Sequence, residues 1–229
     1  MNGQELREAR LQKDWTQQQA AERLGVTQAY LSMLEHGRRV LPHSLARRAV
    51  EVLHAPPTTL PLSDARLSTL HGSEKLRSEL AGLGYPGFAH LRVRARRNPA
   101  EILLTALNES DLDTRVAEGL PWVALRYADM DWDWLVQNAK LFDRQNRLGF
   151  VTTLAFQLAA RSTEPHRSRK LKEYVGILDR SRLVREETFC HDSLTKAERN
   201  WLRLNRPPEA KHWNLLTDMK AENLPHAAV

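Results

Sequence analysis

The sequence contains a single cysteine, Cys190, in 229 residues, and it has no long run of apolar residues. One cysteine cannot form an intramolecular disulfide and leaves no cysteine-based zinc site, so we expect a reducing compartment. No stretch approaches the roughly 20 apolar residues that a membrane-spanning helix needs, and the N-terminus is charged and polar from its first residues. These absences predict a cytoplasmic protein that does not bind a membrane.

Signatures of enzymes are also absent. The chain has no glycine-rich phosphate loop, no G-x-S-x-G motif and no H-E-x-x-H pair. Cys190-His191-Asp192 contains the residue types of a nucleophilic site, but direct neighbours in the chain cannot adopt the geometry that this chemistry needs. We therefore expect no enzymatic activity and no cofactor, and an enzymatic second domain is the least favoured alternative.

Three aspartates, Asp129, Asp131 and Asp133, alternate with large apolar residues. Alternate carboxylates can ligate Ca²⁺ or Mg²⁺ in a suitable loop. The glycine and the distant glutamate of an EF-hand loop are missing, whereas a helix cap at Asp131 requires no further residues. We favour the structural interpretation and expect no metal site.

The charge of the chain is unevenly distributed. A net charge of +6 and a pI of about 9.7 favour an anionic partner. The net charges of successive segments are +2 for residues 1–55, +4 for 56–97, −4 for 98–160 and +4 for 161–229. The acidic middle of the chain should be repelled by DNA, so we expect it to have a different task.

The stretch from Thr16 to Gly37 predicts two short helices joined by a tight turn. Thr16 and Thr27 each precede a helix-forming run, where a hydroxyl can accept a hydrogen bond from an otherwise unpaired amide. Between them, Gly25 can adopt the left-handed conformation that ends a helix. The pattern predicts helices over residues 17–24 and 28–36, which together make a helix-turn-helix.

A helical wheel separates residues 28–36 into two sides. Tyr30, Leu31 and Leu34 cluster on one side. The opposite arc carries Gln28, Ala29, Ser32, Met33 and His36. Such an arc suits entry into the major groove of DNA, because glutamine can bond N6 and N7 of adenine and an alanine or methionine can contact a thymine methyl. The alternative is an ordinary solvated face on a small helical domain.

Several motifs at fixed spacings agree within residues 4–55. They are Arg10, Trp15-Thr16-Gln17, Ala21, Gly25, Gln28, Leu31-Ser32, Glu35, Gly37, Arg38, Arg39 and Pro42. In these features the stretch resembles the Cro/repressor type of helix-turn-helix regulators, also called XRE-like. It departs from the family at Ala9 and Ala20, where a larger aliphatic residue is usual, and the nearby Trp15 can refill that volume.

The resemblance implies a role for individual residues. The positions expected to face DNA bases are Gln28, Ala29, Ser32 and Met33. We expect phosphate contacts at the helix ends and in the following loop, from Gln17, Thr27, His36, Arg38 and Arg39. The alternative for the paired arginines is a solvated loop. The resemblance also implies that Arg10 and Glu35 form an internal ion pair that braces the unit.

The rest of the chain is predicted to be helical, giving an all-α protein with a helix-turn-helix domain at residues 1–59 and a larger bundle-like domain at 98–229. A first helix is expected over residues 4–13, and a fourth begins after Ser44 as cap and runs through His54. Residues 60–97 are expected to be a basic connecting region, and we leave open whether it is folded. It contains a possible helix over 65–80 and an arginine-rich stretch, 90–97, that is a short strand, an arm along phosphates or a solvated run.

The C-terminal domain has recurring helical patterns. They cover residues 99–107, 112–128, 132–142, 145–160, 167–184 and 194–204, with Asn98, Asp111, Asp131, Asp143 and Ser193 as expected caps. A bundle of antiparallel helices is favoured over a stacked array because no repeat of fixed period is visible. The expected core or interface anchors are Trp122, Trp132, Trp134, Trp201 and Trp213.

Two functions fit these features. In the first, the protein is a sequence-specific transcriptional repressor that reads the major groove of double-stranded DNA with residues 28–36 and binds as a homodimer, since one small module contacts only a half-site. In the second, it is an antitoxin that holds a partner protein, a toxin, through the C-terminal domain and regulates its own operon. Residues 98–158 resemble the uncharacterised second half of some bacterial helix-turn-helix regulators, which implies partner binding and assigns no residues.

Overall fold

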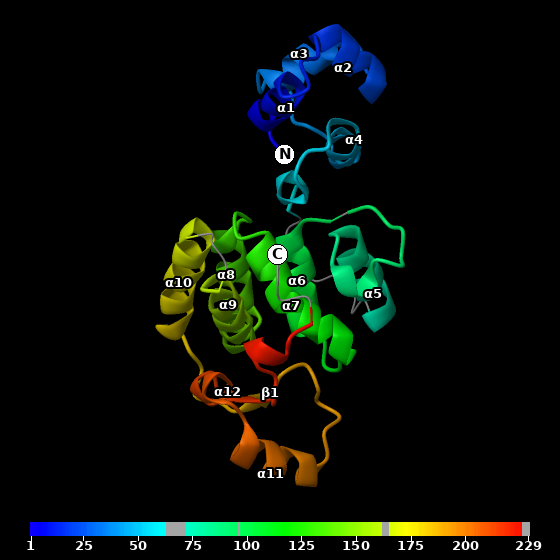
Figure 1. Cartoon of the computed structure of the whole chain (residues 1–229). Helices are drawn as coiled ribbons and strands as arrows, with labels where there is room; N and C mark the ends of the chain where they lie inside the picture. The colour runs from blue at the N-terminus through cyan, green and yellow to red at the C-terminus, as the bar shows by residue number, and fades with distance from the viewer. Residues whose placement is uncertain (63–71, 96, 162–164, 226–229) are drawn as a thin grey trace. The chain divides into compact units, whose positions relative to one another are not determined.

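The computed structural model describes residues 1–62, 72–95, 97–161 and 165–225 (Figure 1). The described residues form twelve α-helices, three short 3-10 helices and one two-stranded sheet. The fold is therefore all-α, as predicted. The contacts divide the chain into two compact units, the first made by the described residues up to 62 with 97 and 98, and the second by 72–95 with 99–225.

The first unit consists of four α-helices and a 3-10 helix. They are α1 (Gly3–Leu11), α2 (Gln17–Leu24), α3 (Gln28–Glu35), α4 (His43–Leu53) and η1 (Pro57–Thr59). The expected caps of α2 and α3 are confirmed: Thr16 Oγ1 accepts from the amide of Gln19, and Thr27 Oγ1 from the amide of Tyr30, each at 3.2 Å. The expected cap of α4 at Ser44 is wrong, because Pro42 precedes the helix and no side chain caps it.

The first unit has its own apolar core. The core residues are Leu6, Ala9, Ala20, Ala21, Leu24, Leu31, Leu34, Leu41, Leu45, Ala46, Ala49 and Leu53. Trp15 packs against this core, and so do Val26 and Tyr30. Trp15 also lies under the guanidinium of Arg23, whose central carbon is 4.2 Å from the ring centroid. The core thus holds α1, α2, α3 and α4 together, and it includes both alanines at which larger residues are usual in similar proteins.

The second unit is larger. Its helices are α5 (Gly72–Gly82), η2 (Pro86–Phe88), α6 (Pro99–Asn108), α7 (Thr114–Arg126), α8 (Trp132–Leu141), α9 (Gln145–Ala159), α10 (Pro165–Asp179), α11 (Lys196–Asn205), α12 (Pro208–His212) and η3 (Ala221–Asn223). The strands β1 (Glu187–Thr188) and β2 (Leu215–Leu216) pair in parallel, with Glu187 opposite Leu215. Neither of these two strands was expected from the sequence, which suggested a possible strand only within residues 90–97.

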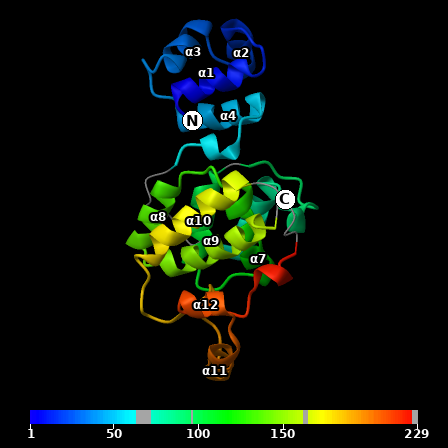
Figure 2. The same ribbon diagram turned by 60° about the vertical axis from the view of Figure 1, so that its left-hand side comes forward.

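Helix α9 is central in this unit. It packs against α7, α8 and α10, and α8, α9 and α10 lie side by side in both views (Figure 1, Figure 2). Its side chains are buried on most of its circumference, including Leu148, Phe150, Val151 and Leu154. The short strands, α11 and α12 lie together at one end of the unit (Figure 1). The helical part of the second unit is thus a bundle, as expected.

The structure answers part of the question about residues 60–97. Residues 72–95 belong to the second unit, because α5 packs against α6 and α7, and Tyr85 and Phe88 are buried. The expected helix over 65–80 falls partly on 63–71, which lie outside the described residues, and α5 continues to Gly82. Residues 92–95 form no strand, and residue 96 lies outside the described residues.

Three of the expected caps in the second unit are wrong. Asp113 caps α7 instead of Asp111, Arg144 stands at the start of α9 instead of Asp143, and Thr195 caps α11 instead of Ser193. Asp111 Oδ1 is occupied elsewhere, since it accepts from the amide of Ser193 at 3.0 Å. The expected cap at Asp131 is confirmed, because its Oδ1 accepts from the amide of Trp134 at 2.9 Å.

Candidate nucleic-acid interface

The turn between α2 and α3 fixes how α3 is presented. Gly25 ends α2 with φ at +66°, a left-handed conformation that glycine adopts without steric cost. The amide of the next residue, Val26, donates to the carbonyl of Ala21 at 3.0 Å. Thr27 then caps α3. Residues close together in the sequence thus define the turn between the two helices.

Helix α3 has one buried and one accessible side. Leu31, Leu34 and Glu35 are buried in the first unit. Gln28 and Ala29 are exposed, and Ser32 and Met33 are half-buried. The four residues expected to face bases therefore lie on the accessible side of a helix that is anchored by its opposite side, which is the arrangement that insertion into a groove requires.

The side chains expected to contact phosphates differ in how many of their hydrogen-bonding groups are already used within the domain. Thr27 is exposed and uses its hydroxyl oxygen as an acceptor, which leaves the hydroxyl proton available to a phosphate. Gln17 is half-buried, and its Nε2 donates to Glu35 Oε2 at 3.0 Å. The second N–H of that amide remains for another acceptor.

His36, at the C-terminal end of α3, has its Nδ1 2.7 Å from the carbonyl oxygen of Ser32. A carbonyl only accepts, so Nδ1 carries the proton. Nε2 can then donate to a phosphate only in the protonated imidazolium form.

Arg38 and Arg39 follow α3 in an exposed loop. The amide of Arg38 donates to the carbonyl of Met33 at 2.9 Å, which ties the loop to the helix. No described residue accepts a hydrogen bond from either guanidinium. Both side chains are thus available for bidentate contact with phosphate oxygens.

Arg10 and Glu35 form an ion pair in the interior of the first unit. Arg10 Nε donates to Glu35 Oε1 at 2.7 Å, and Arg10 Nη2 donates to Glu35 Oε2 at 2.9 Å. A third donor, Arg10 Nη1, reaches the carbonyl of Trp15 at 2.8 Å. The pair joins α1 to the end of α3 and to the chain just before α2, so it holds the elements of the interface in place.

Comparison with models of known protein families matches residues 3–62 to a helix-turn-helix domain. The N-terminal unit is a helix-turn-helix domain. The match is consistent with the resemblance to Cro/repressor-type regulators, and domains of this kind bind DNA, which indicates a DNA-binding regulator. Comparison with curated proteins and with solved structures gave no significant match.

The environment of Glu35 in the helix-turn-helix domain affects its titration. Burial acts to raise the pKa of this carboxyl, but hydrogen bonds from Arg10 and Gln17 outweigh burial and leave the pKa below its ordinary value. Glu35 is therefore ionised at neutral pH, and the ion pair is intact there.

A further arginine of the helix-turn-helix domain was not anticipated from the sequence. Arg48 on α4 donates through Nη2 to the carbonyl of Arg23 at the end of α2, at 3.3 Å. This contact satisfies one of the carbonyls that a helix end leaves unpaired. Nothing in the local pattern distinguishes Arg48 from its neighbour Arg47, so only the packing of α4 on α2 reveals it.

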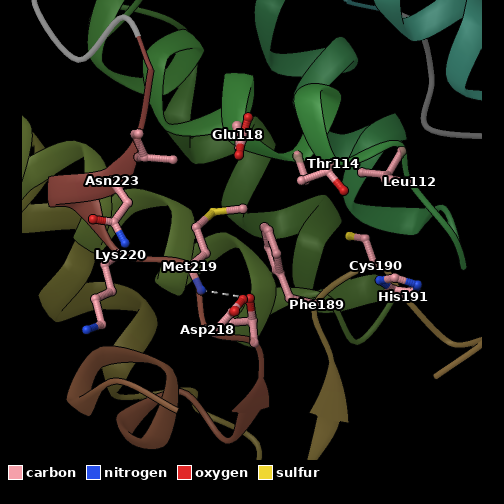
Figure 3. Close-up of a pocket in the computed structure, with 13 residues that line it drawn as sticks. Leu112, Thr114, Glu118, Phe189, Cys190, His191, Asp218, Met219, Lys220 and Asn223 are labelled. Carbon is pink, nitrogen blue, oxygen red and sulfur yellow. Dashed lines mark hydrogen bonds between the residues drawn. The ribbon is translucent and has the colours of Figure 1, made fainter. Parts of the chain in front are cut away.

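The tripeptide Cys190-His191-Asp192, which contains the residue types of a nucleophilic site, has a buried thiol (Figure 3). Cys190 is buried, its Sγ lies 3.7 Å from the carbonyl oxygen of Ala106, and Arg147 Nη1 lies 3.5 Å from the same sulfur. Burial raises the pKa of Cys190 to about 11. The thiol is therefore protonated at neutral pH and acts here as a packed side chain.

The three alternate aspartates have separate partners. Asp131 caps α8, Asp129 lies 3.5 Å from Lys170 Nζ, and Asp133 accepts from the hydroxyl of Tyr174 at 3.3 Å. Tyr174 also stacks on Trp132, with ring centroids 5.0 Å apart. These side chains link α8 to α10, which is a structural role.

The five tryptophans of the second unit differ in how far they are buried. Trp122, Trp132 and Trp213 are buried, and Trp134 is half-buried. Trp201 is 55% exposed. Three are thus core anchors, and one is available at the surface.

No helix formed by the described residues is long and apolar enough to cross a membrane.

Proposed function

We propose that this protein is a sequence-specific transcriptional repressor of the Cro/repressor type, and that α3 enters the major groove of its operator. The observation that carries this proposal is the row of accessible residues on α3, opposite the side that is buried in the core. Short side chains at Ala29 and Ser32 allow close approach, and Gln28 supplies an amide for adenine. The loop after α3 supplies two arginines for the flanking phosphates.

The protein is proposed to act as a homodimer in the cytoplasm, with the second unit providing dimerisation or signal sensing and no catalysis. A single helix-turn-helix domain covers only a half-site. Two copies whose recognition helices lie about 34–36 Å apart contact two half-sites one turn apart, which raises both affinity and specificity.

Replacing Gln28 with alanine is expected to weaken binding to the preferred operator by about 1–3 kcal/mol, because a bidentate contact with adenine is lost. Base selection at that position should relax, and other positions should be unaffected. The measurement is fluorescence anisotropy of the full chain on the operator and on single-base variants. Gln4→Ala removes an exposed glutamine from α1 and is the matched control, with unchanged affinity. Equal affinities of the Gln28→Ala and Gln4→Ala variants for the operator would show that Gln28 does not contact a base in the major groove.

Replacing Arg38 or Arg39 with alanine is expected to weaken binding to all DNA sequences alike, because phosphates carry no sequence information. Each substitution should reduce the slope of log affinity against log salt concentration by about 0.9. Arg180→Ala removes the same charge from an exposed position in the second unit and serves as the control. If the slope changes as little in Arg38→Ala and Arg39→Ala as in Arg180→Ala, the two loop arginines do not touch phosphate.

An antitoxin is the second candidate, and one observation favours it. The second unit exposes large apolar side chains: on α11 Trp201 is 55% exposed and Leu204 87%, and ahead of β1 Val184 is 93% exposed. Exposed aromatic and aliphatic residues of this kind are typical of protein interfaces. Co-purification from the native host distinguishes the candidates, since a stoichiometric protein retained in high salt supports an antitoxin and a lone homodimer supports a simple repressor.

A further inference from the structure

The guanidinium of Arg48, on α4, covers the turn between α2 and α3. Its Nη2 donates to the backbone carbonyl of Arg23, near the end of α2, at 3.3 Å. A Cβ added to Gly25 would lie 3.0 Å from Nη1 of Arg48 and 3.3 Å from both Cζ and Nη2. The guanidinium therefore lies against Gly25, at the point where the chain leaves α2 and turns toward α3.

Three physical effects favour this position of Arg48. The carbonyl of Arg23 is one of the last four of α2, which have no partner within the helix. A positive charge at the C-terminal end of a helix is favoured by the helix dipole. Gly25 has no side chain, so the guanidinium can approach its backbone closely. Arg48 thus connects α4 to the turn by a polar contact, in addition to the apolar core.

The side chain of Arg23 does not compete for this contact. Its guanidinium lies over the ring of Trp15, and its Nη1 donates to the carbonyl of Gln19 at 3.4 Å. The two guanidinium groups therefore have separate partners, and the backbone carbonyl of Arg23 accepts from Arg48.

The turn that Arg48 covers leads directly into the residues expected to face bases. Gln28 and Ala29 are the first two residues of α3, three and four positions after Gly25. Leu31 and Leu34, further along α3, are anchored in the core. A displacement of the turn should therefore move the start of α3 more than the rest of the helix. A binding site needs its side chains held within about 0.5 Å of the productive geometry, so such a displacement would weaken base contacts.

We propose that Arg48 is a positioning residue for base recognition, which holds the turn so that Gln28 and Ala29 enter the major groove in one geometry. This inference rests on the proposed sequence-specific binding of DNA. Arg48 acts through the turn and does not contact DNA itself, unlike the proposed role of Arg38 and Arg39. Its removal should therefore change the choice of base and leave the dependence of affinity on salt unaltered.

The contact with the turn is tested without DNA, by amide hydrogen exchange of the full-length protein measured by NMR. The reporter is the amide of Val26, which donates to the carbonyl of Ala21. Arg48→Ala should speed exchange of this amide by about three- to tenfold, the value of one hydrogen bond. Arg47→Ala removes the same charge from the neighbouring exposed position on α4 and is the matched control, with unchanged exchange.

Two results of the exchange measurement would overturn the proposal. Equal exchange of the Val26 amide in Arg48→Ala and Arg47→Ala would show that Arg48 does not hold the turn. Equally faster exchange throughout α1, α2, α3 and α4 would show that Arg48 stabilises the whole domain and has no specific effect on the turn.

Base recognition is tested on the duplex motif that the parent protein selects from a random library. Arg48→Ala should lower affinity for this motif by about three- to tenfold and relax base choice at the position that Gln28 reads, with the same salt slope as Arg47→Ala. In a Gln28→Ala background the substitution should have a smaller effect, because the contact that it positions is already lost.

Unchanged base choice in Arg48→Ala would overturn the proposal. A salt slope lower by about 0.9 than that of Arg47→Ala would also overturn it, because Arg48 would then contact a phosphate itself. A parent protein without any base preference would instead contradict the proposed function, and the exchange of the Val26 amide would still decide whether Arg48 holds the turn.

Discussion

Replacing Glu35 with alanine is expected to lower the free energy of unfolding of the helix-turn-helix domain by about 3–5 kcal/mol, because it leaves a buried guanidinium without its counter-charge. Arg10 donates two hydrogen bonds to Glu35, and both side chains are buried. The loss is comparable to the whole stability of a small domain. Operator binding should therefore fall with it. Hydrogen–deuterium exchange in residues 3–62 measures the change within the full chain.

The control for this prediction is Glu51→Ala, which removes an exposed glutamate from α4 and should change stability by less than about 0.5 kcal/mol. The double variant Arg10→Met and Glu35→Leu removes both charges and should be much less destabilised than Glu35→Ala. If Glu35→Ala exchanges no faster than Glu51→Ala, the pair does not brace the domain.

The same pair predicts a dependence of stability on pH. Because hydrogen bonding lowers the pKa of Glu35 in the folded domain, the stabilisation is present above the ordinary pKa of 4.5. It is lost progressively as the pH falls from there through the lowered, folded-state pKa. The Arg10→Met and Glu35→Leu variant should lose less stability over this acidic range than the parent does.

Replacing Trp213 with alanine is expected to destabilise the second unit by about 3–5 kcal/mol, because it empties a large volume in a closed core. Trp213 is fully buried, and its Nε1 donates to Thr153 Oγ1 on α9 at 2.9 Å. Urea denaturation followed by circular dichroism measures the loss. Trp201→Ala removes the same side chain from an exposed position on α11 and should cost far less.

The contact of Trp213 with α9 provides a further check. A Cβ on Gly149 would lie 2.3 Å from Cζ3 of Trp213, so Gly149→Ala should destabilise the parent by about 1–3 kcal/mol through overpacking. In the Trp213→Ala background the same substitution should have little additional cost. Equal costs in the two backgrounds would show that the indole and Gly149 are not in contact.

The helix-turn-helix domain was largely predictable from sequence because its determinants are local. Thr16 and Thr27 cap α2 and α3 by accepting hydrogen bonds from amides only three residues further along the chain. Gly25 takes the left-handed conformation that its lack of a side chain allows. The bounds of α2 agree with the prediction, and those of α3 differ by one residue. The ion pair between Arg10 and Glu35 spans 25 positions and came only from the resemblance to a family.

The second unit was less predictable because tertiary contacts decide between local alternatives. Asp111 and Asp113 are both suitable caps for α7, and Asp111 is engaged by the amide of Ser193, which is distant in the sequence. Strands β1 and β2 contain two residues each, too few for a recognisable pattern. Arg147 lies fully inside the bundle, where Nη1 donates to the carbonyls of Leu107 and Glu109 at 3.0 and 2.9 Å. A helical pattern alone does not reveal such a buried charge.

The residues of the candidate nucleic-acid interface also divide into features that local sequence predicts and features that depend on tertiary contacts. The wheel placed Gln28 and Ala29 on the accessible side of α3, and both are exposed. It could not show that Gln17 already donates to Glu35, since that hydrogen bond joins two helices. Base and phosphate contacts themselves remain predictions, because they are properties of a complex with DNA.

Selection of bound duplexes from a random DNA library by the full-length protein tests the central claim most directly. Reading of the major groove by α3 predicts that a single motif is enriched, as an inverted repeat with half-sites about 10 base pairs apart, and that Gln28→Ala relaxes one position in each half-site. A library that stays random after repeated rounds, while binding still varies with salt, would contradict sequence-specific recognition and leave only attraction to the phosphate backbone.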